Sequence, residues 1–178
     1  MTSADSREAP RPFLIRAEAP GDAPAIDGLI RRAFADDPHG SHNEERIVRA
    51  LRAAGALSVS LVAGQGDAII GHVAFSPVAV GSGAQRWYGL GPLAVEPAFQ
   101  QRGIGSALVE AGLAELEALA AAGWVVLGEP GYYGRFGFRV VEGLVYPGPP
   151  PEYFLGKVLD GVPPTGVVEY HDAFSIEP

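Results

Sequence analysis

The sequence predicts an α/β fold in which a mixed, mostly antiparallel sheet is flanked by helices. Two apolar segments, residues 68–80 and 85–95, are separated by the glycine-containing turn at residues 81–83, which is typical of an antiparallel hairpin. Residues 103–122 instead carry apolar side chains three and four positions apart, as helices that cover a sheet do. The 178 residues, 47% of them hydrophobic, suffice for one domain with a buried core.

The first half of the chain is predicted to hold two helices between two strands. Asp22 and Asn43 are residue types that cap helix N-termini, and apolar residues at helical spacing follow each of them. The expected elements are a strand at residues 13–16, helices after residues 22 and 43, and a strand at residues 58–63.

Prolines interrupt both strands of the predicted hairpin. The strand at residues 68–80 is expected to bend or bulge near Pro77. Gly91 and Pro92 interrupt the strand at residues 85–95, which suggests a bulge or an unpaired edge.

The longest helix is predicted to lie between this hairpin and a buried strand. Gly123 is expected to end the helix at residues 103–122. Residues 124–127 are wholly apolar, which is typical of a strand buried in a parallel pair. Residues 166–170 are interpreted as a last strand that closes the sheet.

The chain is interpreted as a flexible N-terminal tail, residues 1–12, and a single domain, residues 13–178. Within the domain, residues 143–178 are a C-terminal extension whose role the sequence leaves open. No segment reaches the ~18 continuous apolar residues of a membrane span, and the start has no apolar signal-peptide core. A cytoplasmic protein with no membrane partner is therefore expected by default.

Composition excludes several kinds of site. The chain has 13 Lys and Arg against 21 Asp and Glu, a net charge of −8, so nucleic acid is not expected as a partner and a cationic small molecule is weakly favoured. The absence of cysteine excludes disulfides, thiolate metal ligands and a cysteine nucleophile. The four histidines show no ligand spacing, so no metal is expected.

A glycine-containing turn joins the interrupted strand to the long helix. Its sequence is Gln100-Gln101-Arg102-Gly103-Ile104-Gly105. Glycines let backbone N–H groups approach an anion, the helix N-terminus adds partial positive charge, and Arg102 adds a full one. The turn lacks the Gly-Lys-Ser/Thr ending of a Walker loop and the third glycine of a dinucleotide fingerprint. The residues alone therefore predict either a pyrophosphate cradle or a plain turn.

Three segments together resemble the GCN5-related N-acetyltransferase (GNAT) superfamily. Gln100-x-x-Gly103-x-Gly105 resembles its motif A, Tyr133-x-x-x-Gly137-Phe138 resembles its tyrosine element, and residues 71–75 fit its central strand. The segments follow the family order over residues 12–142, and residues 90–95, 127–130 and 132–138 resemble its YhbS-type branch. The resemblance implies a twisted sheet with a splayed strand pair at the coenzyme site.

The resemblance also implies acetyl-CoA as the co-substrate and assigns residues that bind it. In the family, backbone N–H groups of the motif A loop hold the coenzyme pyrophosphate. The pantetheine arm pairs with the preceding strand, which splays from the next one, here residues 124–127. The implied residues are Leu93 and Val95 for the pantetheine, and Gln101, Arg102, Gly103, Ile104, Gly105 and Ser106 for the pyrophosphate.

By the same resemblance, Tyr133 is the general acid that protonates the leaving thiolate. Its neighbour Tyr132 is interpreted as a packing or substrate-lining residue. Some relatives carry a base glutamate on the strand before motif A, but Gly89 stands at that position here. Glu129 is the candidate base, with His72 and a base acting through water as alternatives.

The predicted function is direct transfer of acetyl from acetyl-CoA to a primary amine of a small molecule or peptide. Direct transfer is expected because no cysteine can carry the acyl group. The resemblance implies that the acceptor enters near a loop rich in ionisable residues, although solvated-loop and helix-cap roles are favoured for each of them: Asp36, Asp37, His39, His42, Glu44 and Glu45.

The main alternative is a non-catalytic acyl-CoA-binding sensor or interaction module. A structural subunit with an empty glycine loop and a transferase acting on aminoacyl-tRNA are further alternatives, the latter disfavoured by the net charge of −8. A homodimer is left open.

Overall fold

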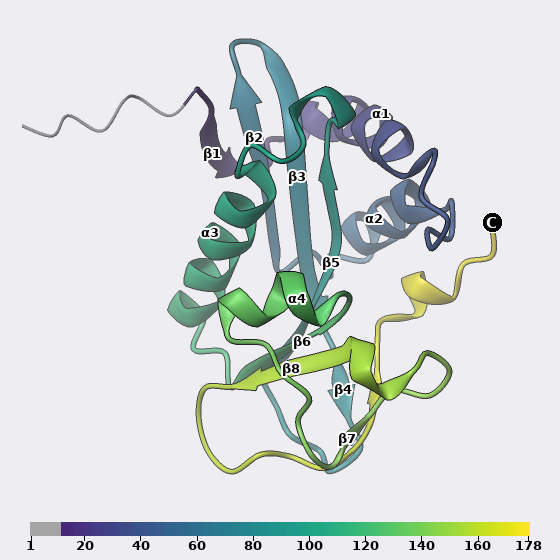
Figure 1. Ribbon diagram of the computed structural model, residues 1–178, viewed down its shortest axis with the longest axis vertical. Coiled ribbons are helices and arrows are strands. Elements are labelled where there is room, and N and C mark those ends of the chain that lie inside the picture. The colour runs from purple at the N-terminus through teal and green to yellow at the C-terminus, as the bar shows by residue number, and fades with distance from the viewer. Residues whose placement is uncertain (1–11) are drawn as a thin grey trace, which may run out of the picture.

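The computed structural model describes residues 12–178, so all but the last residue of the predicted tail lie outside the described part. Its centre is a six-stranded sheet with the strand order β1-β2-β3-β5-β6-β8 (Figure 1). Neighbouring strands are antiparallel except β5 and β6, which run parallel. The predicted mixed, mostly antiparallel sheet is therefore confirmed. The strands are β1 (Leu14–Ala17), β2 (Val59–Gln65), β3 (Ala68–Pro77), β5 (Trp87–Val95), β6 (Gly123–Leu127) and β8 (Phe154–Val158).

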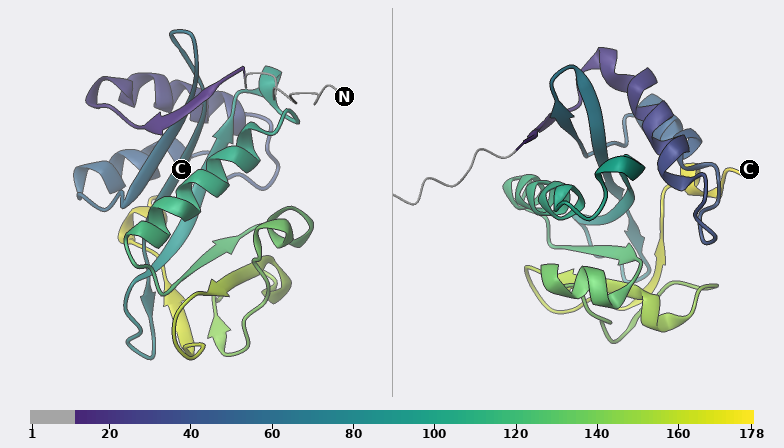
Figure 2. Two further views of the ribbon diagram at one scale, coloured as in Figure 1. Left: turned by 90° about the vertical axis from the view of Figure 1, so that its left-hand side faces the viewer. Right: turned by 45° about the horizontal axis from the view of Figure 1, so that its top comes forward.

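Helices cover both faces of this sheet, as the amphipathic segments predicted. Helices α1 (Ala23–Phe34) and α2 (Glu44–Ala53) lie on one face, and α3 (Ile104–Ala118) lies on the other (Figure 2). The short helix α4 (Pro130–Tyr133) follows β6 on the α3 side (Figure 1). Within residues 12–178, no helix is long and apolar enough to cross a membrane.

Pro92 and Pro77, the two prolines of the predicted hairpin, affect their strands differently. In β5, two residues, Gly91 and Pro92, oppose one residue of β3, because the register shifts between Val73 and Phe75. This is the bulge that the sequence predicted. At Pro77 the prediction of one long strand is wrong, because the chain leaves the main sheet there.

The residues after Pro77 belong to a second, three-stranded sheet. Its order is β4-β9-β7, with β4 (Ala79–Val80), β9 (Gly166–Glu169) and β7 (Leu144–Val145). The prediction that residues 166–170 close the main sheet is therefore wrong. That edge is formed by β8, which pairs with β6 and which the sequence analysis missed. Its sequence, FLGKV, is short and contains both Gly and Lys, so it gives no clear strand pattern.

Helix α3 ends earlier than predicted. Its last residue is Ala118, and the left-handed conformation of Ala120 (φ 57°) turns the chain away. Gly123 does not end the helix; it begins β6. A Cβ at this position would lie 2.3 Å from the ring of Trp87, so close packing, and not a helix end, requires the glycine.

The two predicted capping side chains have other partners. Asp22 is the N-cap residue of α1, but its carboxylate accepts hydrogen bonds from the Ala19 N–H (2.7 Å) and from Arg16 (2.6 Å). Asn43 precedes α2, but its amide donates to the carbonyl of Ile176. Each residue stands at the predicted N-cap position, but neither side chain makes a capping hydrogen bond to its helix. The Asn43 Oδ1 instead accepts from the Ser41 hydroxyl.

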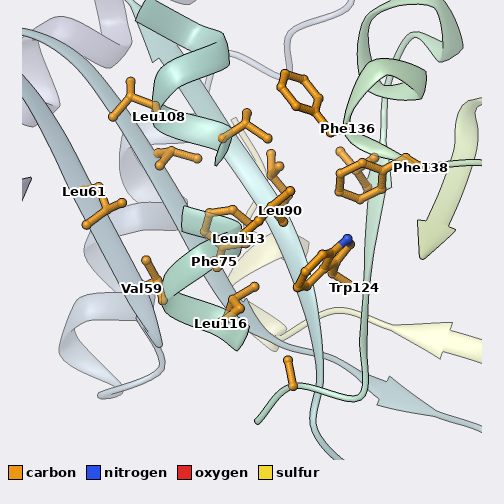
Figure 3. Packing of buried hydrophobic residues seen from close by; sticks show 14 of the residues in the cluster. Val59, Leu61, Phe75, Leu90, Leu108, Leu113, Leu116, Trp124, Phe136 and Phe138 are labelled. Atoms are coloured by element: carbon orange, nitrogen blue, oxygen red, sulfur yellow. The ribbon is translucent and has the colours of Figure 1, made fainter. Parts of the chain in front are cut away.

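The main core lies between the sheet and α3 (Figure 3). Phe75 projects from β3 against α3 at Gly112, where a Cβ would lie 2.2 Å from the ring. Trp124 on β6 is fully buried in the same cluster, which Phe136 and Phe138 join from the segment after α4. This packing fixes α4 and its two tyrosines relative to the sheet.

Candidate active site

The parallel strands β5 and β6 separate halfway along β5. They pair from Trp87 with Gly123 to Leu90 with Val126, and β6 ends at Leu127. The rest of β5 has no partner strand on that side among the described strands. The splayed strand pair implied by the resemblance is therefore present. Leu93 and Val95, the predicted pantetheine contacts, lie on the unpaired half of β5.

The loop after β5 presents unused backbone donors. Gln101 (φ 60°) and Gly103 (φ 81°) both adopt left-handed conformations, and α3 begins at Ile104. The N–H groups of residues 101–106 donate to no backbone carbonyl of the described chain, and the first helical bond runs from Ala107 to Gly103 (3.0 Å). Such a run of free donors at a helix N-terminus is a site for phosphate.

Side chains hold this loop in place. The Gln100 amide donates to the carbonyl of Val95 (3.2 Å), which ties the loop to the end of β5. The guanidinium of Arg102 lies 5.4 Å from the ring centroid of Phe99 and is exposed. The structure thus brings all six residues predicted to hold pyrophosphate, 101–106, into one exposed turn and the first helical turn.

The two adjacent tyrosines of α4 have different neighbours: Tyr133 packs at the end of β6, and Tyr132 packs against α3. The ring of Tyr133 lies against Gly128, where a Cβ would be 2.4 Å away, and packs edge-on against Phe138 at a centroid distance of 5.7 Å. Burial raises the pKa of Tyr133, and Tyr132 raises it further. The Tyr133 hydroxyl therefore stays protonated at neutral pH, as a proton donor must.

The side chain of Tyr132 extends from α4 to the first turn of α3. Its hydroxyl oxygen lies 2.8 Å from the position of a Cβ on Gly105. Helix α4 therefore lies beside the first turn of α3, which follows the predicted phosphate loop (Figure 1). The Tyr132 hydroxyl lies close to Gly105 of α3 and to the unpaired half of β5.

The candidate bases are not brought together with the tyrosines in one hydrogen-bonded cluster. Glu129 is exposed at the N-cap of α4, where its backbone carbonyl accepts from the N–H groups of Tyr132 (3.1 Å) and Tyr133 (3.0 Å). At Gly89, a Cβ would lie 2.4 Å from the ring of Tyr170. Tyr170 therefore fills the volume that a side chain at position 89 would need.

Sequence reasoning missed Tyr170 as a residue near the site. It follows β9, and its hydroxyl is buried without a hydrogen-bond partner in the described chain. Burial raises the pKa of Tyr170, and the nearby hydroxyls of Tyr146 and Tyr133 raise it further. No local signal marks this residue, because its contact with Gly89 depends on how the second sheet packs on the first.

His72 belongs to a buried network on the α1 face. Its Nε2 lies 2.8 Å from the Ser60 hydroxyl and 3.8 Å from the carboxylate of Glu18, which also accepts from Arg52 (2.6 Å). Burial lowers the pKa of His72 although Glu18 opposes this. The ring is fully buried, so it is placed for packing and hydrogen bonding and not for proton exchange with a substrate.

Because of this network, the free energy of unfolding is expected to decrease as the pH falls into the acid range. Burial would raise the pKa of Glu18, but the nearby His72 ring and the hydrogen bonds from Arg52 and Ser60 outweigh it and lower the pKa to about 2. The unfolded chain therefore takes up the proton of Glu18 at higher pH than the folded protein, and the same holds for His72. Stability is expected to fall as pH drops below ~6.5, and the Glu18 contribution, about 2 kcal/mol, to be lost from pH ~4.5 towards pH 2.

Urea unfolding at pH 7, 5.5, 4.5, 3.5 and 2.5 measures this dependence. Glu18→Gln should lower stability at pH 7 and flatten the slope below pH ~4.5. Asp160→Asn is the matched control, because Asp160 pairs with Arg86 at an exposed site (3.3 Å, 71% exposed) and should leave the slope unchanged. An equal slope in Glu18→Gln and the parent protein would contradict the network's role.

The ionisable residues of the predicted acceptor loop have structural roles. The Asp37 carboxylate accepts from the His39 N–H (2.8 Å), the Glu44 carboxylate accepts from the Ser41 N–H (2.7 Å), and Glu45 pairs with Arg31 (3.3 Å). Within the described residues, no group of three or more His, Asp or Glu side chains is placed to hold a metal.

An open pocket of about 620 Å³ lies at the start of β5, away from the phosphate loop at its end. Tyr88 and Tyr170 line it together with the turn between β4 and β5. Glu169 and Asp172 contribute acidic groups, and Arg86, which also lines it, already pairs with Asp160. The pocket is therefore distinct from the free donors of the loop.

Comparisons with known proteins agree with this geometry. The sequence profile of the acetyltransferase (GNAT) family matches residues 26–138. The uncharacterized N-acetyltransferase YhbS of Escherichia coli K12 is 39% identical over 172 residues, which cover 92% of this chain and 99% of YhbS.

Two solved structures are similar over nearly the whole chain. A GNAT family acetyltransferase from Brucella melitensis, in complex with acetyl-CoA, has a TM-score of 0.82 and 43% identity and covers 91% of this chain and 97% of its own. The structure of E. coli YhbS in complex with CoA has a TM-score of 0.84 and 37% identity and covers 95% of each chain. The resemblance seen in the sequence is confirmed: this chain belongs to the acetyltransferase (GNAT) family.

Proposed function

We propose that this acetyltransferase moves acetyl from acetyl-CoA to a primary amine. The observation that carries the proposal is the unpaired half of β5 leading into the free N–H groups of residues 101–106. Both features match the coenzyme, whose pantetheine arm has amide groups and whose pyrophosphate is an anion. The complexes of the two similar proteins with acetyl-CoA and CoA support the same ligand.

Residues of β5 and of the loop after it fit both the pantetheine arm and the pyrophosphate of this ligand. Backbone groups of Leu93 and the N–H of Val95 have no partner strand on that side and can bond the pantetheine amides, whereas the Val95 carbonyl accepts from the Gln100 amide. The N–H groups of residues 101–106 hold the pyrophosphate, and Arg102 adds a positive charge at the exposed end of the loop. When bound, acetyl-CoA supplies an activated thioester.

The chemistry requires few groups from the protein. The amine nitrogen attacks the thioester carbonyl, the carbon–sulfur bond breaks, and the thiolate takes a proton from the Tyr133 hydroxyl. The ammonium form of the acceptor loses one proton before attack, and the nitrogen loses a second as the tetrahedral intermediate collapses, to Glu129 directly or through water. Tyr133 then regains a proton from water. Since the chain has no cysteine to carry the acetyl group, transfer is direct, and correct positioning of the two substrates supplies much of the rate.

The acceptor is proposed to be a cationic amine. The chain carries a net charge of −8, and the pocket beside Tyr88 and Tyr170 has Glu169 and Asp172 in its lining. Its volume, about 620 Å³, is that of a small-molecule site. The pocket lies at the start of β5, where β6 is still paired, and Tyr88 in its lining is two residues before Leu90, the last β5 residue that pairs with β6. An amine that enters there approaches the point of strand separation.

One observation favours a second candidate, a non-catalytic acyl-CoA sensor. Gly89 provides no carboxylate, and Tyr170 fills the space where one would lie. The sensor requires the coenzyme site but not the Tyr133 hydroxyl, so turnover separates the two candidates.

The test is release of coenzyme A thiol from acetyl-CoA in the presence of 1,4-diaminobutane, spermidine, n-butylamine and a short peptide with a free N-terminus. The protein gives no background with a thiol reagent, because it has no cysteine. Amine-dependent release, greater with the diamines than with n-butylamine, is expected. Binding of coenzyme A without release for any of these amines would favour the sensor.

A further inference from the structure

The two glycines of the phosphate loop are required for different physical reasons. Gly103 adopts a left-handed conformation (φ 81°), and a Cβ there would meet nothing within 4 Å. Gly105 lies within α3 and has no positive φ, so its backbone would accept any residue. A Cβ on Gly105 would instead lie 2.8 Å from the hydroxyl oxygen of Tyr132. Any side chain at position 105 would therefore contact the Tyr132 hydroxyl.

The hydroxyl of Tyr132 lies where three parts of the proposed coenzyme site meet. The same Cβ position on Gly105 is 3.7 Å from a methyl group of Val95 and 3.8 Å from one of Leu93, both on the unpaired half of β5. The first turn of α3, with its free N–H groups, supplies the other side. The hydroxyl is therefore close to the point where a pantetheine chain on β5 would join a pyrophosphate on the loop.

Side chains of α4 and of the segment after it pack against the ring of Tyr132. The guanidinium of Arg135 lies 4.2 Å from the ring centroid, and the Arg135 Nε donates to the Tyr132 carbonyl (3.1 Å). Tyr133 and Phe136 pack edge-on against the ring at centroid distances of 4.9 and 5.5 Å. Within residues 12–178, no hydrogen-bond partner is found for the Tyr132 hydroxyl, so a fixed ring presents an unused donor.

We propose that Tyr132 binds the coenzyme, its hydroxyl donating to an oxygen at the junction of pantetheine and pyrophosphate, while Tyr133 acts in proton transfer. The inference rests on the proposed function, because it needs acetyl-CoA in this opening. Adjacent helical residues point about 100° apart, so one short helix directs two hydroxyls to two parts of one ligand. A donor to a charged phosphate oxygen stabilises the complex more than a neutral pair does.

The contact between Tyr132 and Gly105 makes the proposal testable by a double-mutant cycle. In the parent protein, Gly105→Ala places a methyl group against the Tyr132 hydroxyl, so the tyrosine must move from its binding position. In Tyr132→Phe, the oxygen is gone and the methyl group finds more room. The cost of Gly105→Ala in coenzyme affinity should therefore be smaller in the Tyr132→Phe background.

The experiment is calorimetric titration with coenzyme A of the parent protein, Tyr132→Phe, Gly105→Ala, the double variant, and Tyr146→Phe. Tyr146 is the matched control, because it packs in the second hydrophobic cluster, away from α3. Tyr132→Phe is expected to weaken coenzyme A binding about tenfold, to raise the KM for acetyl-CoA by a similar factor, and to leave the Tm of the free protein within about 1 °C. Tyr146→Phe should bind coenzyme A as the parent does.

Two results would overturn the inference while leaving the proposed function intact. One is parent-like affinity of Tyr132→Phe for coenzyme A. The other is an equal cost of Gly105→Ala in both backgrounds, which would mean that the glycine is needed for the ligand alone. Absence of coenzyme A binding by the parent protein would instead remove the proposed function, and this inference with it.

Discussion

Replacing Tyr133 by Phe is expected to lower kcat about 10²–10⁴-fold while coenzyme A affinity stays within about twofold. The ring remains, so its contacts with Gly128 and Phe138 are kept. Only the hydroxyl proposed to protonate the leaving thiolate is lost. Because burial raises the pKa of Tyr133, the parent rate should show no fall from this group as pH rises to 9.

Thiol release and calorimetry together measure this prediction. Tyr146→Phe is again the control, since it removes a hydroxyl from an aromatic contact (5.3 Å between the Tyr146 and Tyr170 centroids) that is outside the proposed chemistry. An unchanged kcat in Tyr133→Phe would show that the thiolate leaves without this proton donor. A loss of affinity with kcat retained would exchange the roles proposed for Tyr132 and Tyr133.

Replacing Gly112 by Ala is expected to lower the free energy of unfolding by about 1–3 kcal/mol. Alanine favours a helix by about 1 kcal/mol over glycine, so propensity alone predicts the opposite sign. Packing decides, because a Cβ at position 112 would lie 2.2 Å from the ring of Phe75, which is fully buried. The helix or the ring must shift, and the core of Figure 3 is disturbed.

Gly28→Ala is the matched control for this substitution. It is also a helical glycine, but its Cβ would meet only Nη1 of Arg32 at 3.1 Å, at the end of a long side chain that is 56% exposed and pairs with Glu96 through its other nitrogens. Gly28→Ala should therefore raise stability by about 0.5–1 kcal/mol. Urea unfolding of both variants measures the difference, and stabilisation by Gly112→Ala would contradict the packing described for α3.

Local patterns predicted the elements whose side chains alternate or repeat clearly. The hairpin of β3 and β5, the parallel strand β6 and helix α3 were all expected, and the bulge at Gly91 and Pro92 follows from residues that cannot continue a paired strand. β8 and the second sheet were not predicted. Their strands are short, and their positions depend on pairing between distant segments.

In the candidate site too, features with a local sequence signal were predicted, and contacts between separate elements were not. The phosphate loop has a local signal, because glycines and a helix start stand next to each other in the sequence. The contacts of Tyr132 with Gly105 and of Tyr170 with Gly89 have none, because each joins residues on separate elements. The end of α3 was mispredicted for a related reason. Gly123 is paired with Trp87 of the neighbouring strand β5 and packs against its ring, a contact that a helical sequence pattern cannot reveal.

A thermal melt with and without acetyl-CoA tests the central claim, that the unpaired half of β5 and residues 101–106 hold the coenzyme. At ~100 times its dissociation constant a ligand adds about 2.7 kcal/mol, which raises Tm by about 5–10 °C for a domain of this size. We expect such a rise with acetyl-CoA and with coenzyme A. No rise at millimolar ligand would contradict the account, and the free N–H groups of the loop would then belong to an ordinary turn.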